Sequence, residues 1–266
     1  ENELRRSLEK FHGDPDPKAV ATAWPYLKHP DRQIRYAARL AIEHQPVAEW
    51  QDKALNEKDP ISSINAVIAL ARQNKTDLKG GMLKSLLAIN FKSLSEPQQL
   101  DLLRAYELVF LRTGAPDAAT NSKIAAMLNP YFPANSNSSD LNRALSKILI
   151  YLDAPGVIPK TLALLEAKEQ PTNLTAGGNT ATASAELIMR NPQYGLDIAD
   201  MLKSMPPAQQ TYYATMLSLA SKNWTPELHE RYFKWFYKAF SYKGGRSYVG
   251  FIDRARKLAL KHVPEG

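Results

Sequence analysis

Apolar side chains recur at helical spacing along almost the whole chain. Leu4, Leu8 and Phe11 lie three or four positions apart, which places them on one face of a helix. The same spacing continues through segments of about 10–18 residues, which end at short breaks containing Pro, Gly, Asp or Asn. Two short β-prone runs, 109–111 and 148–150, each lie inside a longer helical pattern. The pattern therefore predicts an all-α protein.

The starts and ends of several expected helices carry local signals. Ser95 and Thr225 suit N-caps, because a proline and a glutamate follow each of them in the first turn. Gly114 and Gly244 suit helix ends. Beyond residue 46 the expected helices cover 47–55, 61–71, 82–89, 100–111, 118–128, 139–152, 156–167, 180–190, 195–204, 207–221, 226–241 and 246–262.

One stretch of the chain repeats after a shift of 29 residues. The segment 35–45 aligns with 64–74, so that Ala37 falls on Ala66, and both segments follow a turn containing proline and aspartate. A third version lies over 140–152. Small residues on these faces let helices approach closely, and repeated units of this kind bury a continuous core by stacking. The repeat therefore predicts a stack of helix pairs.

The residues around the first repeat resemble those of HEAT repeats, a family of helix-pair solenoids. Trp24 and Pro25 suit a first helix with an internal proline, and a similar helix opens at 157–159. Asp31 and Arg35 match the acid and the base of the family pattern, four residues apart on one helical face.

The HEAT resemblance covers residues 14–74 well and 139–168 in part. It implies a HEAT-like α-solenoid, a right-handed superhelix of about seven helix pairs. We expect one domain over 1–266, with a softer joint at 129–139, where the sequence reads as a loop rich in Asn, Ser and Pro.

Composition narrows the possible chemistry. The 266 residues include no Cys, which excludes disulfides, thiolate metal sites, iron–sulfur ligation and covalent c-type haem attachment. The five His residues show no metal-binding spacing, and His229 is expected on a solvated helix surface. A glycine-rich turn at 177–180 could hold an anion but lacks the Lys of a nucleotide site, which favours a plain loop. The sequence therefore predicts no enzyme, no cofactor and no metal site.

Positive charge is concentrated near the C-terminal end. The net charge is +7, and residues 225–266 hold nine Lys or Arg against four Asp or Glu, together with nine of the 24 aromatic residues. This segment supplies the candidate binding residues, which are Arg231, Lys234, Trp235, Lys238, Tyr242, Lys243 and Arg246.

Three interpretations of this basic aromatic segment stay open. The first is a core-facing aromatic stripe behind a solvated basic face, and the helical spacing of its rings supports it. The stripe would consist of Tyr232, Phe233, Phe236 and Phe240. The second is a surface that docks a protein. The third is a nucleic-acid surface, on which cations contact phosphates and rings stack on bases.

The segment 180–262 resembles the end of helical modules in large exported bacterial proteins. The resemblance depends on Trp224-Thr225-Pro226 and on the stretches 232–236 and 244–252. In those proteins a HEAT-like array lies beside a β-propeller sugar-dehydrogenase-like domain or a cytochrome c domain. The resemblance implies a non-catalytic scaffold module, periplasmic or extracellular, whose partner is a neighbouring domain or another protein.

The alternative function is a nucleic-acid-binding α-solenoid that uses the basic C-terminal helices, but the sequence favours a protein partner over nucleic acid. The chain begins at Glu1, which also suggests a piece of a longer protein. No apolar run approaches the roughly 20 residues that span a bilayer, so no transmembrane segment is expected.

Overall fold

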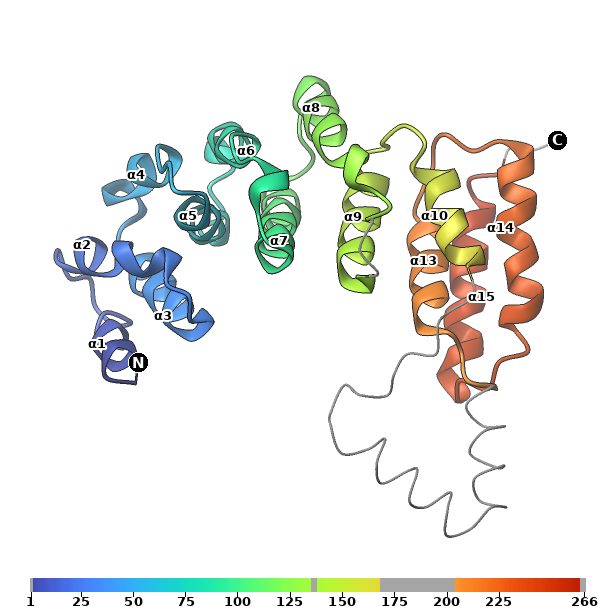
Figure 1. The fold of residues 1–266 in the computed structure, drawn as a ribbon, viewed down its shortest axis with the longest axis horizontal. Coiled ribbons are helices and arrows are strands. Elements are labelled where there is room, and N and C mark those ends of the chain that lie inside the picture. The colour runs from blue at the N-terminus through green and yellow to red at the C-terminus, as the bar shows by residue number, and fades with distance from the viewer. Residues whose placement is uncertain (1, 135–137, 168–203, 264–266) are drawn as a thin grey trace, which may run out of the picture. The chain divides into compact units, whose positions relative to one another are not determined.

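The computed structural model describes residues 2–134, 138–167 and 204–263. These residues form helices joined by short turns and contain no β-strand, which confirms the all-α prediction (Figure 1). The chain divides into two compact units, residues 1–130 and residues 131–266.

The first unit consists of short α-helices linked by single turns of 3₁₀-helix. Most of the breaks fall where the sequence places Pro, Gly, Asp or Asn. Its elements are α1 (Asn2–Glu9), α2 (Ala19–Ala23), η1 (Trp24–Lys28), α3 (Arg32–Glu43), η2 (Val47–Glu49), α4 (Gln51–Leu55), α5 (Pro60–Arg72), η3 (Thr76–Leu78), α6 (Lys79–Leu87), η4 (Phe91–Ser93), α7 (Glu96–Thr113), α8 (Ala118–Leu128) and η5 (Asn129–Tyr131).

The helices of this unit lie in two rows, and helices that follow each other in the chain alternate between the rows. The helices α1, α3, α5 and α7 contact one another in that order, and α4, α6 and α8 form the second row (Figure 1). Each of α3, α5 and α7 also contacts the helix that precedes it, namely α2, α4 and α6. Within the first unit, alternate helices are therefore neighbours, and each of α3, α5 and α7 also packs on the helix before it.

The helix α5 is the most deeply buried element of the first unit. Every residue from Ser62 to Ala71 is buried, because α3 and α7 flank the helix while η1, α4 and α6 also pack on it. A helix that is apolar on most sides is expected in such a position. The buried Asn65 amide donates to the carbonyl oxygens of Leu27 and Ile61, 3.0 Å away in each case, and so satisfies both of its N–H groups.

Two aspartates start equivalent helices of the first unit. The Asp31 carboxylate accepts hydrogen bonds from the backbone N–H groups of Gln33 and Ile34, and Asp59 caps α5 in the same way. Asp31 and Arg35, the acid and the base of the HEAT-like pattern, make no ion pair with each other. Arg35 Nη1 instead donates to the carbonyl oxygens of residues 29 and 30, each 2.8 Å away. Asp31 therefore caps α3, and Arg35 binds the turn that precedes the helix.

Most other local signals of the sequence are confirmed. Where the sequence suggests one helix with an internal proline, the α-helix α2 ends at Ala23 and the 3₁₀-helix η1 follows, with Pro25 in its first turn. Gln98 accepts a hydrogen bond from the backbone N–H of Ser95 at the start of α7, and Gly114 ends that helix with a φ of 80°. The two β-prone runs are helical, within α7 and within α9 (Ser139–Tyr151).

The described part of the second unit contains five helices, which pack as one group (Figure 1). The helix α13 contacts α9, α10 and α15, while α14 contacts α10 and α15. Besides α9, the helices are α10 (Val157–Glu166), α13 (Ala208–Ser218), α14 (Pro226–Ala239) and α15 (Arg246–Leu260). The expected helices over 180–190 and 195–204, apart from Ser204, and the turn at 177–180 lie outside the described residues.

The prediction that Gly244 ends a helix is wrong. The helix α14 ends at Ala239, and Gly245, with a φ of 78°, directly precedes α15. Gly244 lies against other side chains, since a Cβ atom there would lie 2.6 Å from Pro206 Cγ and closer still to Tyr248. Close packing, and not a helix terminus, requires the glycine at this position.

Among the described helices, none combines the length and the apolar character that crossing a bilayer requires.

Candidate functional site

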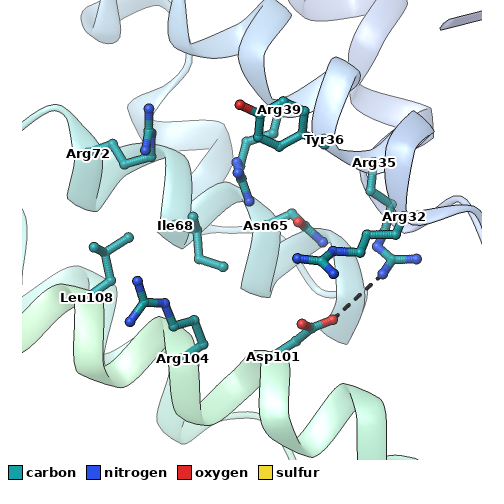
Figure 2. A pocket seen from close by; sticks show the side chains of 10 residues that line it. All are labelled: Arg32, Arg35, Tyr36, Arg39, Asn65, Ile68, Arg72, Asp101, Arg104 and Leu108. Carbon is teal, nitrogen blue, oxygen red and sulfur yellow. Dashed lines mark ion pairs between the residues drawn. The ribbon is translucent and has the colours of Figure 1, made fainter. Parts of the chain in front are cut away.

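Three neighbouring helices of the first unit, α3, α5 and α7, line a hollow of about 260 Å³ (Figure 2). Half of the residues that line it are arginines. The lining consists of Arg32, Arg35, Tyr36, Arg39, Asn65, Ile68, Arg72, Asp101, Arg104 and Leu108. We call this feature the arginine hollow.

The amphipathic pattern of α3 explains why three of these arginines lie together. Arg32, Arg35 and Arg39 are three and four positions apart, so they share one face of the helix. The residues of the other face, from Ile34 to Ile42 at helical spacing, are buried. Because α3, α5 and α7 pack side by side, Arg72 and Arg104 join the same surface (Figure 2).

Glu43, at the end of α3, binds two of the arginines from below the surface. Its side chain is only 7% exposed. Arg72 Nε donates to Glu43 Oε2 at 2.6 Å, and this hydrogen bond raises the pKa of the Arg72 guanidinium. Arg39 Nε lies 3.1 Å from Glu43 Oε1, but both atoms are buried without a hydrogen bond. One carboxylate therefore serves two guanidinium groups, and only one of them is well aligned.

Burial lowers the pKa of the Arg39 guanidinium. The carboxylate of Glu43 opposes this effect, and repulsion from Arg72 adds to it. The side chain of Arg39 is 15% exposed and its guanidinium carbon lies 5.3 Å from the centroid of the Tyr36 ring. Arg39 is thus a largely buried cation at the side of the hollow, and the carboxylate of Glu43 neutralises its charge only in part.

The positive charges of the other arginines are neutralised more weakly by nearby carboxylates. Arg35 Nη2 lies 3.7 Å from Asp101, and Arg104 pairs with Glu107 at 3.0 Å on the exposed surface of α7. Arg32 is exposed and has no ion-pair partner among the described residues. Together with Glu43, the hollow sets five guanidinium groups against three carboxylates. The arrangement leaves a local excess of positive charge.

The hollow also offers apolar surface. Ile68 of α5 lies between Arg39 and Arg104, and Leu108 of α7 lies beside Arg104 (Figure 2); these two buried residues are 9% and 8% exposed. Tyr36, 49% exposed, lies beside Arg39. A mixture of bidentate donors, an aliphatic surface and a half-exposed ring is typical of a surface that binds another molecule.

Most of the predicted site residues on α14 bind other side chains of the protein itself. Arg231 donates two hydrogen bonds to Glu166, of 2.9 Å from Nε and 2.7 Å from Nη2. Lys234 pairs with Glu230 at 2.8 Å, one turn earlier on the helix. Trp235 is 9% exposed, and its indole N–H donates to Gln210 Oε1 at 3.1 Å.

The remaining predicted residues do not converge on one place. Lys238 Nζ lies 5.8 Å from the centroid of the Tyr242 ring, and Lys243 is exposed. The side chain of Arg246 lies outside the described part of the chain. Pockets that the described residues form in the second unit include a shallow one on α15, of about 450 Å³, lined by none of the predicted residues.

The aromatic stripe of α14 is mainly core. Tyr232 is fully buried and donates a 2.7 Å hydrogen bond to the Ala214 carbonyl oxygen, and Phe236 packs against it edge-on. Phe233 is half-buried. Phe240 departs from the expected stripe, because 37% of its side chain is exposed and the Arg256 guanidinium lies over its ring.

The expectation that His229 lies on a solvated surface is wrong. Its side chain is 9% exposed and stacks on Trp224 with ring centroids 4.6 Å apart. Burial lowers the pKa of the imidazole, and the nearby His262 acts in the same direction. In the part of the chain that the structure describes, no group of His, Asp and Glu could hold a metal ion.

Comparison of the chain with protein-family models, with curated proteins and with solved structures finds no match. The case for a functional site therefore depends on the geometry of the chain itself.

Sequence reasoning missed the arginine hollow because charge was counted along the chain. Residues 1–130 contain 18 Lys and Arg and 16 Asp and Glu, a net charge of only +2. The signal that could have found the hollow is the spacing of Arg32, Arg35 and Arg39 opposite an apolar stripe.

Proposed function

We propose that the chain is a non-catalytic interaction module with a HEAT-like α-solenoid architecture, and that it binds its partner at the arginine hollow. The stacked helix pairs of the first unit and the 29-residue repeat support this architecture. In such an arrangement one row of helices offers a continuous surface, and here α3, α5 and α7 contribute it.

The observation that carries the proposal is the excess of guanidinium groups around the half-exposed Tyr36 and the edges of Ile68 and Leu108. Stability alone does not require it, because exposed ion pairs add little free energy of folding. Arg32 makes no such pair among the described residues, and Arg104 pairs only at the surface. Arginine at the centre of a partly apolar surface is enriched in binding sites of proteins.

The lining of the hollow favours binding over catalysis. Of the described residues that line it, Asp101 alone carries a carboxylate, and Tyr36 and Asn65 supply the only other polar side chains besides the arginines. General acid–base catalysis needs a proton donor or acceptor with a pKa near the working pH, aimed at a bound substrate. The guanidinium groups instead suit the recognition of anionic groups.

The resemblance of residues 180–262 to helical modules of exported bacterial proteins supplies the proposed setting. In that setting the module belongs to a larger periplasmic or extracellular protein, and its partner is a neighbouring domain or a second protein. The nucleic-acid alternative at the C-terminal helices is weaker, because Arg231, Lys234 and Lys257 already pair with carboxylates.

An unbiased peptide selection tests the proposed function. A displayed library of random peptides is selected against the full chain, and the enriched peptides are then titrated against two charge-matched variants. The variant R32E/R104E changes exposed arginines of the hollow, whereas K75E/K123E changes two exposed lysines of the same unit outside it.

We expect the selected peptides to lose affinity for R32E/R104E and to keep it for K75E/K123E. Peptides that bind both variants as well as the unchanged chain would place the binding surface elsewhere and overturn the proposal. Circular dichroism of both variants checks that the helices are intact.

A further inference from the structure

The arginine hollow contains donors that the protein itself leaves available. Arg32 has no ion-pair partner among the described residues, and Arg104 binds Glu107 through one Nη atom on an exposed surface. The side chain of Arg39 is 15% exposed, with its Nε atom buried beside Glu43, so any contact with a ligand is through the exposed remainder of its guanidinium group. Guanidinium groups bind planar carboxylates with two parallel hydrogen bonds, so these arginines are suited to acidic side chains.

The charge distribution disfavours a nucleic acid at this surface. A phosphate backbone is bound by a long basic track that contacts many phosphates in succession. The first unit is close to neutral, with 18 cationic and 16 anionic side chains, and its excess charge is confined to one hollow.

The apolar component of the hollow points to a peptide. Ile68 lies between Arg39 and Arg104, and Leu108 lies beside Arg104 (Figure 2). Tyr36 is half-exposed beside Arg39. A segment that combines carboxylates with aliphatic side chains satisfies both the guanidinium groups and this surface. A small inorganic anion would leave the apolar surface uncovered.

From these observations we infer that the hollow binds an acidic peptide segment of a partner protein, with Asp or Glu side chains on Arg32, Arg39 and Arg104 and an aliphatic side chain over Ile68 and Leu108. This inference rests on the proposed function and specifies its ligand. Glu43 then neutralises part of the positive charge of the hollow from beneath, since it binds Arg72 and lies beside Arg39.

Defined probes test the inference by fluorescence anisotropy at low and at physiological salt. The first probe is a short labelled peptide with several Glu and two Leu residues, and the second replaces each Glu by Gln. The third is a single-stranded oligonucleotide with the net charge of the first. Each is titrated against the full chain, R32E/R104E, the milder variant R32Q/R104Q and the control K75E/K123E.

We expect the Glu peptide to bind roughly tenfold or more tightly than the Gln peptide, which corresponds to one good charged contact. R32E/R104E should weaken it by about tenfold or more, R32Q/R104Q by less, and K75E/K123E by under about twofold. The milder variant keeps the test valid if charge reversal disturbs the fold.

Three results would overturn the inference. Equal loss in R32E/R104E and K75E/K123E would show attraction to overall charge only. Tighter binding of the oligonucleotide, lost with the hollow arginines, would make the ligand a nucleic acid and leave the site in place. Absence of binding to the Glu peptide, while peptides from the random library still require the hollow, would reject the acidic ligand but keep the proposed function.

Discussion

Positive charge gathers in two regions of this protein, the arginine hollow of the first unit and the helices α14 and α15 of the second, and the two differ in construction. In the hollow, arginines from α3, α5 and α7 meet across helices and outnumber the neighbouring carboxylates. On α14 and α15, Lys234 and Lys257 pair with acids one turn away on their own helices. The C-terminal region therefore has the larger net charge in the sequence, but its positive charge is less concentrated at the surface than that of the hollow.

This difference teaches that charge along a chain is a poor guide to charge on a surface. Composition averages over neighbours in sequence, whereas a ligand meets neighbours in space. Aromatic content misleads in the same way, because Tyr232 and Phe236 are buried while Tyr237, on the same helix, is 86% exposed.

The largest expected effect concerns the aromatic stripe of α14. Tyr232→Ala should lower the free energy of unfolding by about 4 kcal/mol, because it empties a fully buried site and removes the hydrogen bond to Ala214. Tyr237→Ala should change it by less than about 0.5 kcal/mol, since that ring is exposed. Urea denaturation of both variants measures the difference, and similar losses would contradict a division between core and surface on this helix.

The next effect concerns Glu43, which binds arginines beneath the hollow. Glu43→Gln should destabilise the protein by about 3 kcal/mol, because it leaves Arg39 partly buried without a carboxylate and removes the short pair with Arg72. The exposed Glu49 supplies the matched control, and Glu49→Gln should cost less than about 0.5 kcal/mol.

The same Glu43 variant separates an electrostatic role of the carboxylate, which neutralises part of the charge of the hollow, from a purely structural one. Removing the carboxylate increases the positive charge of the hollow, so affinity for the Glu peptide should rise while stability falls. Peptide titration and chemical denaturation of Glu43→Gln measure the two quantities. A parallel fall of both would mean that Glu43 only maintains the fold, and the contrast between the two regions would then lose its electrostatic basis.

A pH-dependent effect of moderate size is expected in the second unit. Burial lowers the pKa of His229 in the folded state below its unfolded value of about 6.5. The unfolded chain then binds more protons as the pH falls, so this group contributes full stability above about pH 6.5 and loses it below. Thermal melts between about pH 7.5 and 5.5 should show a flatter pH dependence for His229→Phe than for the unchanged chain. Equal slopes would contradict a neutral, buried imidazole.

The smallest expected effect is on nucleic-acid binding by the C-terminal helices. Lys234 already pairs with Glu230, and Lys238 lies near the Tyr242 ring. The variant K234E/K238E should therefore change the affinity for duplex DNA at low salt by less than about twofold, as measured by anisotropy. A large, salt-sensitive loss would restore the nucleic-acid alternative and reverse the ranking of the two basic regions.

Local features of the fold could be predicted because they depend on residues close in sequence. The caps at Ser95 and Thr225 and the helix end at Gly114 all follow from hydrogen bonds or dihedral angles within one turn. Predictions failed where a distant contact decided the outcome. Gly244 meets Pro206, 38 positions earlier in the chain.

The candidate site could be predicted only in part for the same reason. The sequence identified cationic and aromatic residues in the C-terminal segment, but the partners of Arg231 and Trp235, Glu166 and Gln210, lie 65 and 25 positions away in the chain. Glu43 and Arg72 are 29 positions apart, which equals the repeat offset, so a comparison of successive repeats could have suggested that pair.

The sequence by itself determined that this protein is all-helical, where most described helices begin and end, and that cysteine chemistry is absent. These properties follow from periodicity, capping and composition, which act within a few residues. Tertiary structure alone decided that His229 and Trp235 are buried and that five arginines share one hollow. Such outcomes depend on which helix faces meet, and the faces meet through packing between residues far apart in the chain.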